Sequence, residues 1–94
     1  MVNIDDDAER AYRESMEVLE RYYGAGNVIL EKVSYWLAHG PPEVVVEKIA
    51  QFLEAGCTTP VLRFTSFDPL GQLERCIDEV MPALRGKAKV AAAG

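Results

Sequence analysis

The sequence has only two cysteines, Cys57 and Cys76, and a single histidine, His39. Two cysteines without a Cys-x-x-Cys spacing cannot build a disulfide scaffold, and with one histidine they cannot complete a zinc site within one chain. We therefore predict no metal site. Both cysteines are interpreted as reduced, partly buried small residues of a cytoplasmic protein.

Long apolar runs and clustered positive charge are also lacking. No stretch approaches the roughly 18 apolar residues of a transmembrane helix, and Met1 leads into an acidic segment instead of the basic start of a signal peptide. Lys and Arg together number 10, against 15 Asp and Glu, so the net charge is −5. Because phosphate binding needs a clustered positive face, we expect neither nucleic acid nor a membrane as partner.

The composition itself is that of a small folded domain. Of the 94 residues, 49% are hydrophobic and 27% are charged, which is too apolar for disorder. A chain of this length buries only about 60–65% of its unfolded surface, so a partner or an oligomer would add to its stability.

The first half of the chain predicts one short strand and two helices. Val2–Ile4 has strand character, and the acidic residues Asp5–Asp7 can cap a helix that Gly24 ends. A second helix is expected from Asn27 to about His39. Two stretches within it could instead be extended: Val28–Leu30 and Tyr35–Leu37.

The second half begins at the pair Pro41–Pro42, which suits the first turn of a third helix. The apolar stripe of this helix is Val45, Ile49, Phe52 and Leu53, and Ala55–Gly56 closes it. Val61–Thr65 then reads as a strand, in which Arg63 and Thr65 share a face that would be mixed or polar.

A last helix is expected after Asp68–Pro69, with Asp68 as its cap. Its predicted buried side consists of Leu70, Leu73, Ile77, Val80 and Leu84. We expect Pro82 to bend or break this helix, and residues 86–94 to form a flexible tail. Strands joined by helical crossovers favour parallel pairing, so the fold class is α/β and helix-rich, with two short strands and about four helices.

The order of these motifs resembles the carboxyl-terminal end of the luciferase-like monooxygenase family. The features are Gly40, Pro42, Glu43 and Val45 at a helix start, then Ala55–Gly56, the strand Val61–Thr65, and Met81-Pro82-Ala83-Leu84 near the end. The opening segment, VNIDDDAERAYRESMEVLERYYG, is similar to that family's seventh strand and following helix. The resemblance implies that residues 1–85 are the last two βα units of a (β/α)8 barrel.

Members of that family are oxidoreductases that use flavin mononucleotide or a deazaflavin coenzyme. The resemblance implies that Arg63, Thr65 and Ser66 lie at the cofactor pocket of a complete barrel, and it assigns no catalytic residue to this chain. Arg63 could also pair with a carboxylate for structural reasons. Since one quarter of a barrel cannot enclose a cofactor, we expect the isolated chain to bind no flavin and to be inactive.

A different class of protein remains open. The apolar helix faces and unpaired strand edges need burial, which favours a non-catalytic module that associates with itself. A complementary chain that supplies the rest of a barrel would satisfy the same faces.

Overall fold

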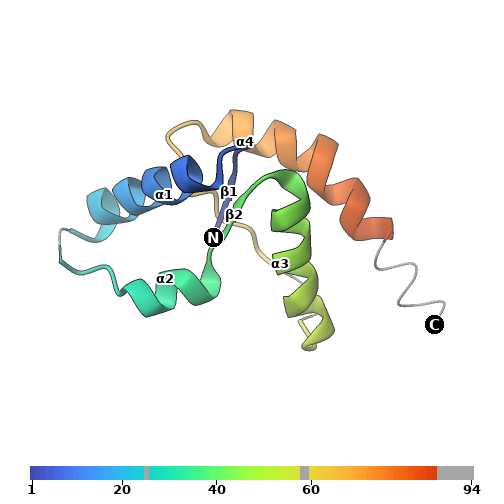
Figure 1. Cartoon of the computed structure of the whole chain (residues 1–94), viewed down its shortest axis with the longest axis horizontal. Coiled ribbons are helices and arrows are strands. Elements are labelled where there is room, and N and C mark those ends of the chain that lie inside the picture. Colours follow the sequence, from blue (N-terminus) through green and yellow to red (C-terminus); the bar gives the residue numbers. More distant parts are fainter. Residues whose placement is uncertain (25, 58–59, 87–94) are drawn as a thin grey trace.

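In a computed structural model, the described residues are 1–24, 26–57 and 60–86. The elements along the chain are β1 (Val2–Ile4), α1 (Ala8–Tyr23), α2 (Leu30–Trp36), β2 (Ala38–Gly40), α3 (Pro42–Glu54), α4 (Pro69–Arg75) and the π-helical turn η1 (Cys76–Val80). Residues 81–86 continue the last helix (Figure 1). The prediction of a helix-rich α/β chain is confirmed.

β1 is the central strand of the sheet. It pairs in parallel with β2, in a register that joins Val2 to Ala38 and Ile4 to Gly40. On its other side, Val2 forms a parallel bridge with Phe64. There the amide of Val2 donates to the carbonyl of Arg63 at 2.7 Å, and the amide of Thr65 donates to the carbonyl of Val2 at 2.9 Å. The order across the sheet is therefore β2, β1 and the segment 63–65.

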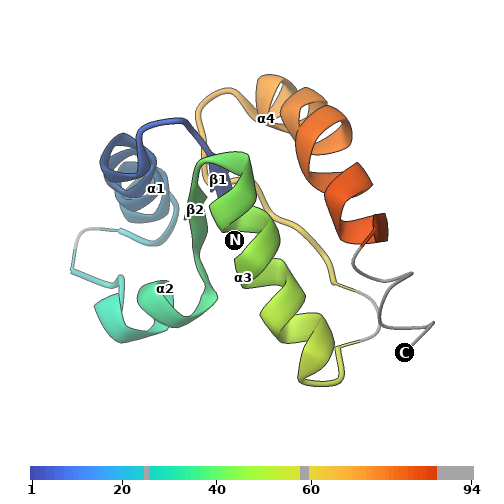
Figure 2. The same cartoon turned by 45° about the vertical axis from the view of Figure 1, so that its right-hand side comes forward.

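Helices cover both faces of this sheet (Figure 2). Successive side chains of a strand point to opposite faces. The Asn3 side chain bonds to Glu14 of α1, whereas Val2 and Ile4 pack against residues of α3 and η1. α1 therefore lies on one face, and α3 with the α4–η1 helix lies on the other.

This arrangement differs from that of successive barrel strands. In a (β/α)8 barrel the helices form one outer ring around the strands. Here α1 and α3 lie on opposite faces, and β1, the first strand in the sequence, lies in the middle. Within the described residues the chain has the order of an open, doubly wound sheet. Because helices cover both faces, even a sheet of three short segments can bury its side chains.

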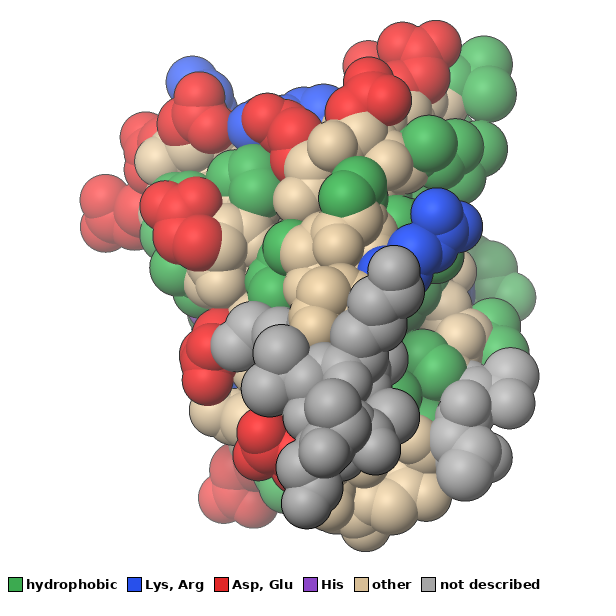
Figure 3. Space-filling model, turned by 90° about the vertical axis from the view of Figure 1, so that its right-hand side faces the viewer, with side chains coloured by type: hydrophobic (Ala, Val, Ile, Leu, Met, Phe, Trp, Pro, Cys, Tyr) green, Lys and Arg blue, Asp and Glu red, His purple; other side chains and the backbone are tan. Residues whose placement is uncertain are grey.

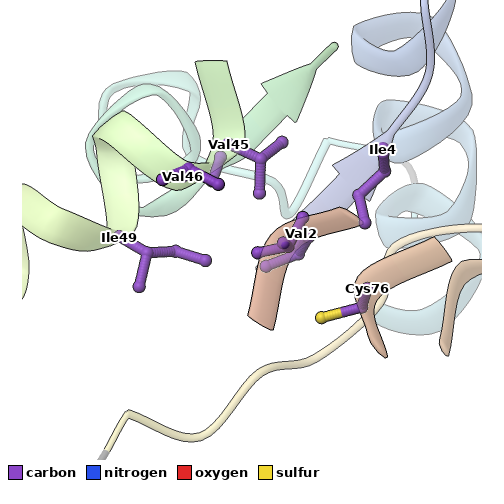
Figure 4. Close-up of a cluster of buried hydrophobic side chains, with 8 residues drawn as sticks. Val2, Ile4, Val45, Val46, Ile49 and Cys76 are labelled. Atoms are coloured by element: carbon purple, nitrogen blue, oxygen red, sulfur yellow. The ribbon is translucent and has the colours of Figure 1, made fainter. Parts of the chain in front are cut away.

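The main hydrophobic core lies between the sheet and the helices on its second face, α3 and the α4–η1 helix (Figure 4). It joins residues from β1, β2, α3 and η1 that are all less than one-tenth exposed: Val2, Ile4, Ala38, Val45, Val46, Ile49, Cys76 and Val80. A second, smaller cluster of Leu19, Val33 and Leu37 fixes α2 against α1. Of the four predicted stripe residues, Val45 and Ile49 are confirmed as core, and Phe52 and Leu53 are only partly buried.

The predicted second helix is shorter than expected, and a strand replaces its end. α2 begins at Leu30, after Ile29, and ends at Trp36. Asn27 does not cap it, since its side-chain amide donates to the carbonyl of Tyr23 at the end of α1. Residues 38–40 are extended because they pair with β1, and at the ends of this pairing the amide of Ala38 donates to the carbonyl of Met1 and the carbonyl of Gly40 accepts the amide of Asp5.

The predicted strand Val61–Thr65 is reduced to the single bridge at Phe64. Its predicted direction, parallel to β1, is confirmed. The segment leaves β1 after Thr65, and beyond that point a side chain from α4 takes its place along the strand.

The side of the last helix that faces the sheet is not the side that carries most of its large apolar residues. Gln72, Cys76 and Val80 are its buried row, whereas Leu70, Leu73 and Ile77 are exposed. The prediction that these three leucine and isoleucine side chains are buried is wrong for this chain alone. Nothing among the described residues covers that side of the helix.

The helix also does not break at Pro82. Its wide turn η1 comes directly before, with the amide of Met81 donating to the carbonyl of Cys76, and helical residues continue to 86. A proline ring clashes with the carbonyl four residues earlier in a regular helix, and a wider turn relieves that crowding. Of the predicted tail, Gly86 is helical, and residues 87–94 lie outside the described residues.

Candidate functional site

The carboxyl edge of the sheet is where an open α/β fold binds ligands, at the point where neighbouring strands lead to helices on opposite faces. Here that point lies between β1, which leads into α1, and segment 63–65, which leads into α4. Two loops flank it, 5–7 and 66–68. The candidate site is built from these loops and from the side chains that reach them.

Gln72 fills the space between the two strands at this point. Its side-chain oxygen accepts the amide of Ile4 at 2.7 Å, and its side-chain nitrogen donates to the carbonyl of Ile4 at 2.9 Å. The same nitrogen lies 3.4 Å from the Asn3 side-chain oxygen. The carboxamide therefore extends the ladder of β1 past Thr65, and it closes the crevice where a ligand would otherwise meet the strand ends.

Asp5 is held by Arg10. The guanidinium donates to both carboxylate oxygens, at 2.6 and 2.7 Å, and the amide of Asp7 donates to one of them at 2.9 Å. The hydrogen bond from Arg10 is the main reason that the pKa of Asp5 is lowered from its usual value. Asp5 is therefore an ionised, already paired carboxylate and a poor general base.

Arg75 joins the two sides of the site. It donates to Asp6 at 2.9 Å and, one helical turn along its own helix, to Glu79 at 2.6 Å. These two carboxylates raise the pKa of Arg75 further above its usual value. The ion pairs connect the loop after β1 to the last helix, so Asp6 and Glu79 are already paired.

The remaining loop carboxylates cap helices. Asp7 accepts the amides of Glu9 and Arg10 at the start of α1, and Asp68 accepts the amide of Gly71 at the start of α4. The prediction that Asp68 is a helix cap is confirmed. Across residues 1–24, 26–57 and 60–86, no group of three or more His, Cys, Asp and Glu side chains is placed to hold a metal ion.

Thr65, one of the predicted cofactor-binding residues, lies in a buried polar cluster beneath α1. Its hydroxyl is 2.8 Å from that of Ser15, and its carbonyl accepts from the Asn3 side chain at 2.9 Å. Asn3 also donates to Glu14 at 2.8 Å. The polar interior expected for Arg63 and Thr65 is confirmed for Thr65 and is wrong for Arg63, which is exposed. The hydroxyl is already bonded and points away from the carboxyl edge, toward the helix.

Arg63 and Ser66 lie apart from this cluster. The exposed Arg63 guanidinium lies over the Tyr22 ring at 4.5 Å and donates to the Tyr23 hydroxyl at 3.0 Å, so it packs on the end of α1. It forms no ion pair with any carboxylate of the described residues. The Ser66 hydroxyl accepts the amide of Asp68 at 3.1 Å. In this chain alone the three residues do not meet around one cavity, and their role toward a cofactor stays a prediction.

Two side chains that organise the site, Asn3 and Gln72, were not singled out from the sequence. The available signal was their type: a polar amide inside an apolar strand, and another in the middle of an otherwise amphipathic helix. Such amides have several donors and acceptors to satisfy, and burial forces them to find partners.

No protein-family model, no curated protein and no solved structure matches the chain. Within the described part, no helix is both long enough and apolar enough to cross a membrane.

Proposed function

We propose that this chain is the carboxyl-terminal βα part of a luciferase-like oxidoreductase that uses flavin mononucleotide or a deazaflavin. The rest of the barrel comes from outside this chain, and the chain alone neither binds flavin nor turns over substrate. Its working compartment is the cytoplasm. In the complete enzyme the cofactor supplies the redox chemistry, and Arg63, Thr65 and Ser66 line one wall of its pocket.

The observation that carries this proposal is the exposure of Leu70, Leu73 and Ile77. These residues recur at the spacing of a buried helix face, yet nothing in the described structure covers them. A sequence that encodes burial on a face left open in isolation is that of one part of a larger protein. The resemblance at Gly40, Pro42 and Ala55–Gly56 is the reason for proposing the luciferase-like family, and a helix does begin at Pro42 and end before Ala55.

The proposal requires a rearrangement. In the barrel, segment 63–65 would be the eighth strand and would keep its pairing with β1, the seventh, whereas β2 would leave β1 and α1 would lie on the same side as α3. In the isolated chain β2 is held on β1, and at its two ends the amide of Ala38 donates to the carbonyl of Met1 and the amide of Asp5 donates to the carbonyl of Gly40, both at 2.9 Å. Each such bond contributes only about 1 kcal/mol net, which a newly completed barrel could exceed.

A second function, a non-catalytic module that associates with itself, has its own supporting observation. Large apolar side chains are exposed on a separate part of the surface, around α2: Ile29, Leu30, Tyr35 and Trp36. Two uncovered apolar regions give a second copy more than one place to bind.

A chimera tests the first function. This chain replaces the carboxyl-terminal quarter of a luciferase-like oxidoreductase, and flavin binding is followed by quenching of flavin fluorescence. We expect the chimera to bind flavin and the isolated chain not to bind it. Arg63→Ala in the chimera is expected to weaken flavin binding, with the exposed Arg13→Ala of α1 as the matched control.

Light scattering across a dilution series of the isolated chain distinguishes the two functions. A monomer near 10 kDa, together with a chimera that binds flavin, supports the oxidoreductase part. A stable oligomer without flavin, together with a chimera that folds but binds none, supports the self-associating module and overturns the first proposal.

A further inference from the structure

An apolar strip runs along the outer side of the last helix. It consists of Leu70, Leu73 and Ile77, whose side chains are 73%, 44% and 56% exposed. Residues spaced by three and four lie on one side of a helix, so these three form a continuous row about two turns long. We refer to them as the α4 strip.

The two borders of the α4 strip differ in chemistry. One border is the buried row of Gln72, Cys76 and Val80, which faces the sheet. The other border is formed by Glu74 and Asp78, both exposed. Neither of these two carboxylates takes part in a hydrogen bond or ion pair within the described structure. Seen from this end of the molecule, hydrophobic and acidic side chains lie next to each other along the upper rim (Figure 3).

Because negative charge lies along only one border of the α4 strip, it indicates which kind of partner covers the strip. We propose that the α4 strip binds an amphipathic helix from outside this chain, with apolar side chains at three- and four-residue steps and with Lys or Arg along the edge that meets Glu74 and Asp78. The apolar row supplies the area that is buried on binding, and the two carboxylates favour positive charge along the facing edge of the partner helix. The inference rests on the proposed function only in that the chain works as part of a larger assembly, and it does not require flavin.

A second copy of this chain fits the strip poorly. If two α4 strips packed antiparallel about a two-fold axis, equivalent borders would face each other, so Glu74 and Asp78 would oppose the same residues of the other copy. Like charges in that position are unfavourable, and the net charge of −5 on each chain adds to the repulsion.

Charge reversal tests the proposal. The probes are two fluorescein-labelled helical peptides of about 18 residues, five turns. They carry the same leucine row and have Lys or Glu along one edge. By fluorescence anisotropy we expect the natural chain to bind the Lys peptide about tenfold more tightly than the Glu peptide. The double variant Glu74→Lys, Asp78→Lys is expected to reverse that preference.

A matched control keeps the net charge equal. Glu17→Lys, Glu20→Lys changes two exposed carboxylates of α1 that also form no hydrogen bond or ion pair among the described residues, and it should leave the preference for the Lys peptide unchanged. Leu73→Asn, Ile77→Asn should abolish binding of both peptides while circular dichroism shows an unchanged fold, since both side chains are exposed.

Equal affinity of the natural chain for both peptides would overturn the proposal, and so would the same reversal in the α1 control, because general electrostatic attraction would then explain binding. Self-association that is lost in Leu73→Asn, Ile77→Asn would also overturn it and assign the strip to a second copy. These readouts involve no flavin, so their failure is distinguishable from failure of the proposed oxidoreductase role.

Discussion

The side chain of Gln72 pairs with both backbone polar groups of Ile4, accepting its amide at 2.7 Å and donating to its carbonyl at 2.9 Å. A single carboxamide thus makes the two hydrogen bonds that a residue of a neighbouring strand would otherwise make. Both groups of Ile4 are buried, so they need partners that the departing segment 63–65 no longer supplies.

Replacing this amide should be costly. Gln72→Leu keeps the size and leaves two buried backbone groups unpaired, at about 1–3 kcal/mol each, so we expect a loss of about 2–6 kcal/mol in the free energy of unfolding. Urea denaturation measures it. Gln51→Leu, an exposed position of α3, is the control and should change stability by less than about 0.5 kcal/mol. Equal effects at the two positions would contradict the role of Gln72.

The polar cluster under α1 should show coupling between Ser15 and Thr65. Their hydroxyls lie 2.8 Å apart and both residues are fully buried. Ser15→Ala and Thr65→Val each leave the other hydroxyl without this partner. The double variant should therefore be about 1 kcal/mol more stable than the sum of the two single changes predicts. Strictly additive losses in a double-mutant cycle would show that the hydroxyls do not interact.

Acid should weaken the contact between Asp5 and Arg10. The pKa of Asp5 is lowered in the folded chain, chiefly by the hydrogen bond from Arg10. The pair's stabilisation is therefore present above the unfolded pKa, near 3.8, and is lost as the pH falls through the lower folded value.

Arg10→Gln should raise the pKa of Asp5 toward its usual value in an NMR titration. Because Arg10 is largely exposed and water screens the pair, the stability lost at neutral pH should be small, and smaller still in high salt. Arg13→Gln, on the same helix, should leave the titration of Asp5 unmoved. An unchanged pKa in Arg10→Gln would assign the shift to another cause.

The two thiols should react at very different rates. Cys57 is exposed and Cys76 is buried in the core, where burial also raises the pKa of the Cys76 thiol. With Ellman's reagent we expect one thiol to react at once and the second only as the chain unfolds. Cys57→Ser should remove the fast phase alone. Rapid reaction of both thiols in native buffer would contradict the packing of η1 against the sheet.

Several local features followed from the sequence because neighbouring residues determine them. The start of α1 at Asp7, the start of α3 at Pro42 and the cap at Asp68 were predicted, since a cap needs only a side chain and the amides two or three residues away. The polar face of Thr65 followed from the alternation of a strand.

The rest depended on partners distant in the sequence. The residues that precede 38–40 in the sequence predict a helix that includes them. They are extended instead because they pair with β1. The apolar period of the last helix identified the Leu70, Leu73 and Ile77 row, but only tertiary contacts decided that Gln72, Cys76 and Val80 face the sheet in this chain.

The sequence alone thus determined where α1, α3 and α4 begin, because caps and proline fix helix starts locally. It also indicated that the first strand and the segment near Phe64 run parallel, because helices join them. The tertiary structure decided that β1 is central, that α1 and α3 cover opposite faces, and that Gln72 completes the strand. Those outcomes depend on which buried amides and carbonyls find partners 60 to 70 residues away, and nothing in the local chain specifies that choice.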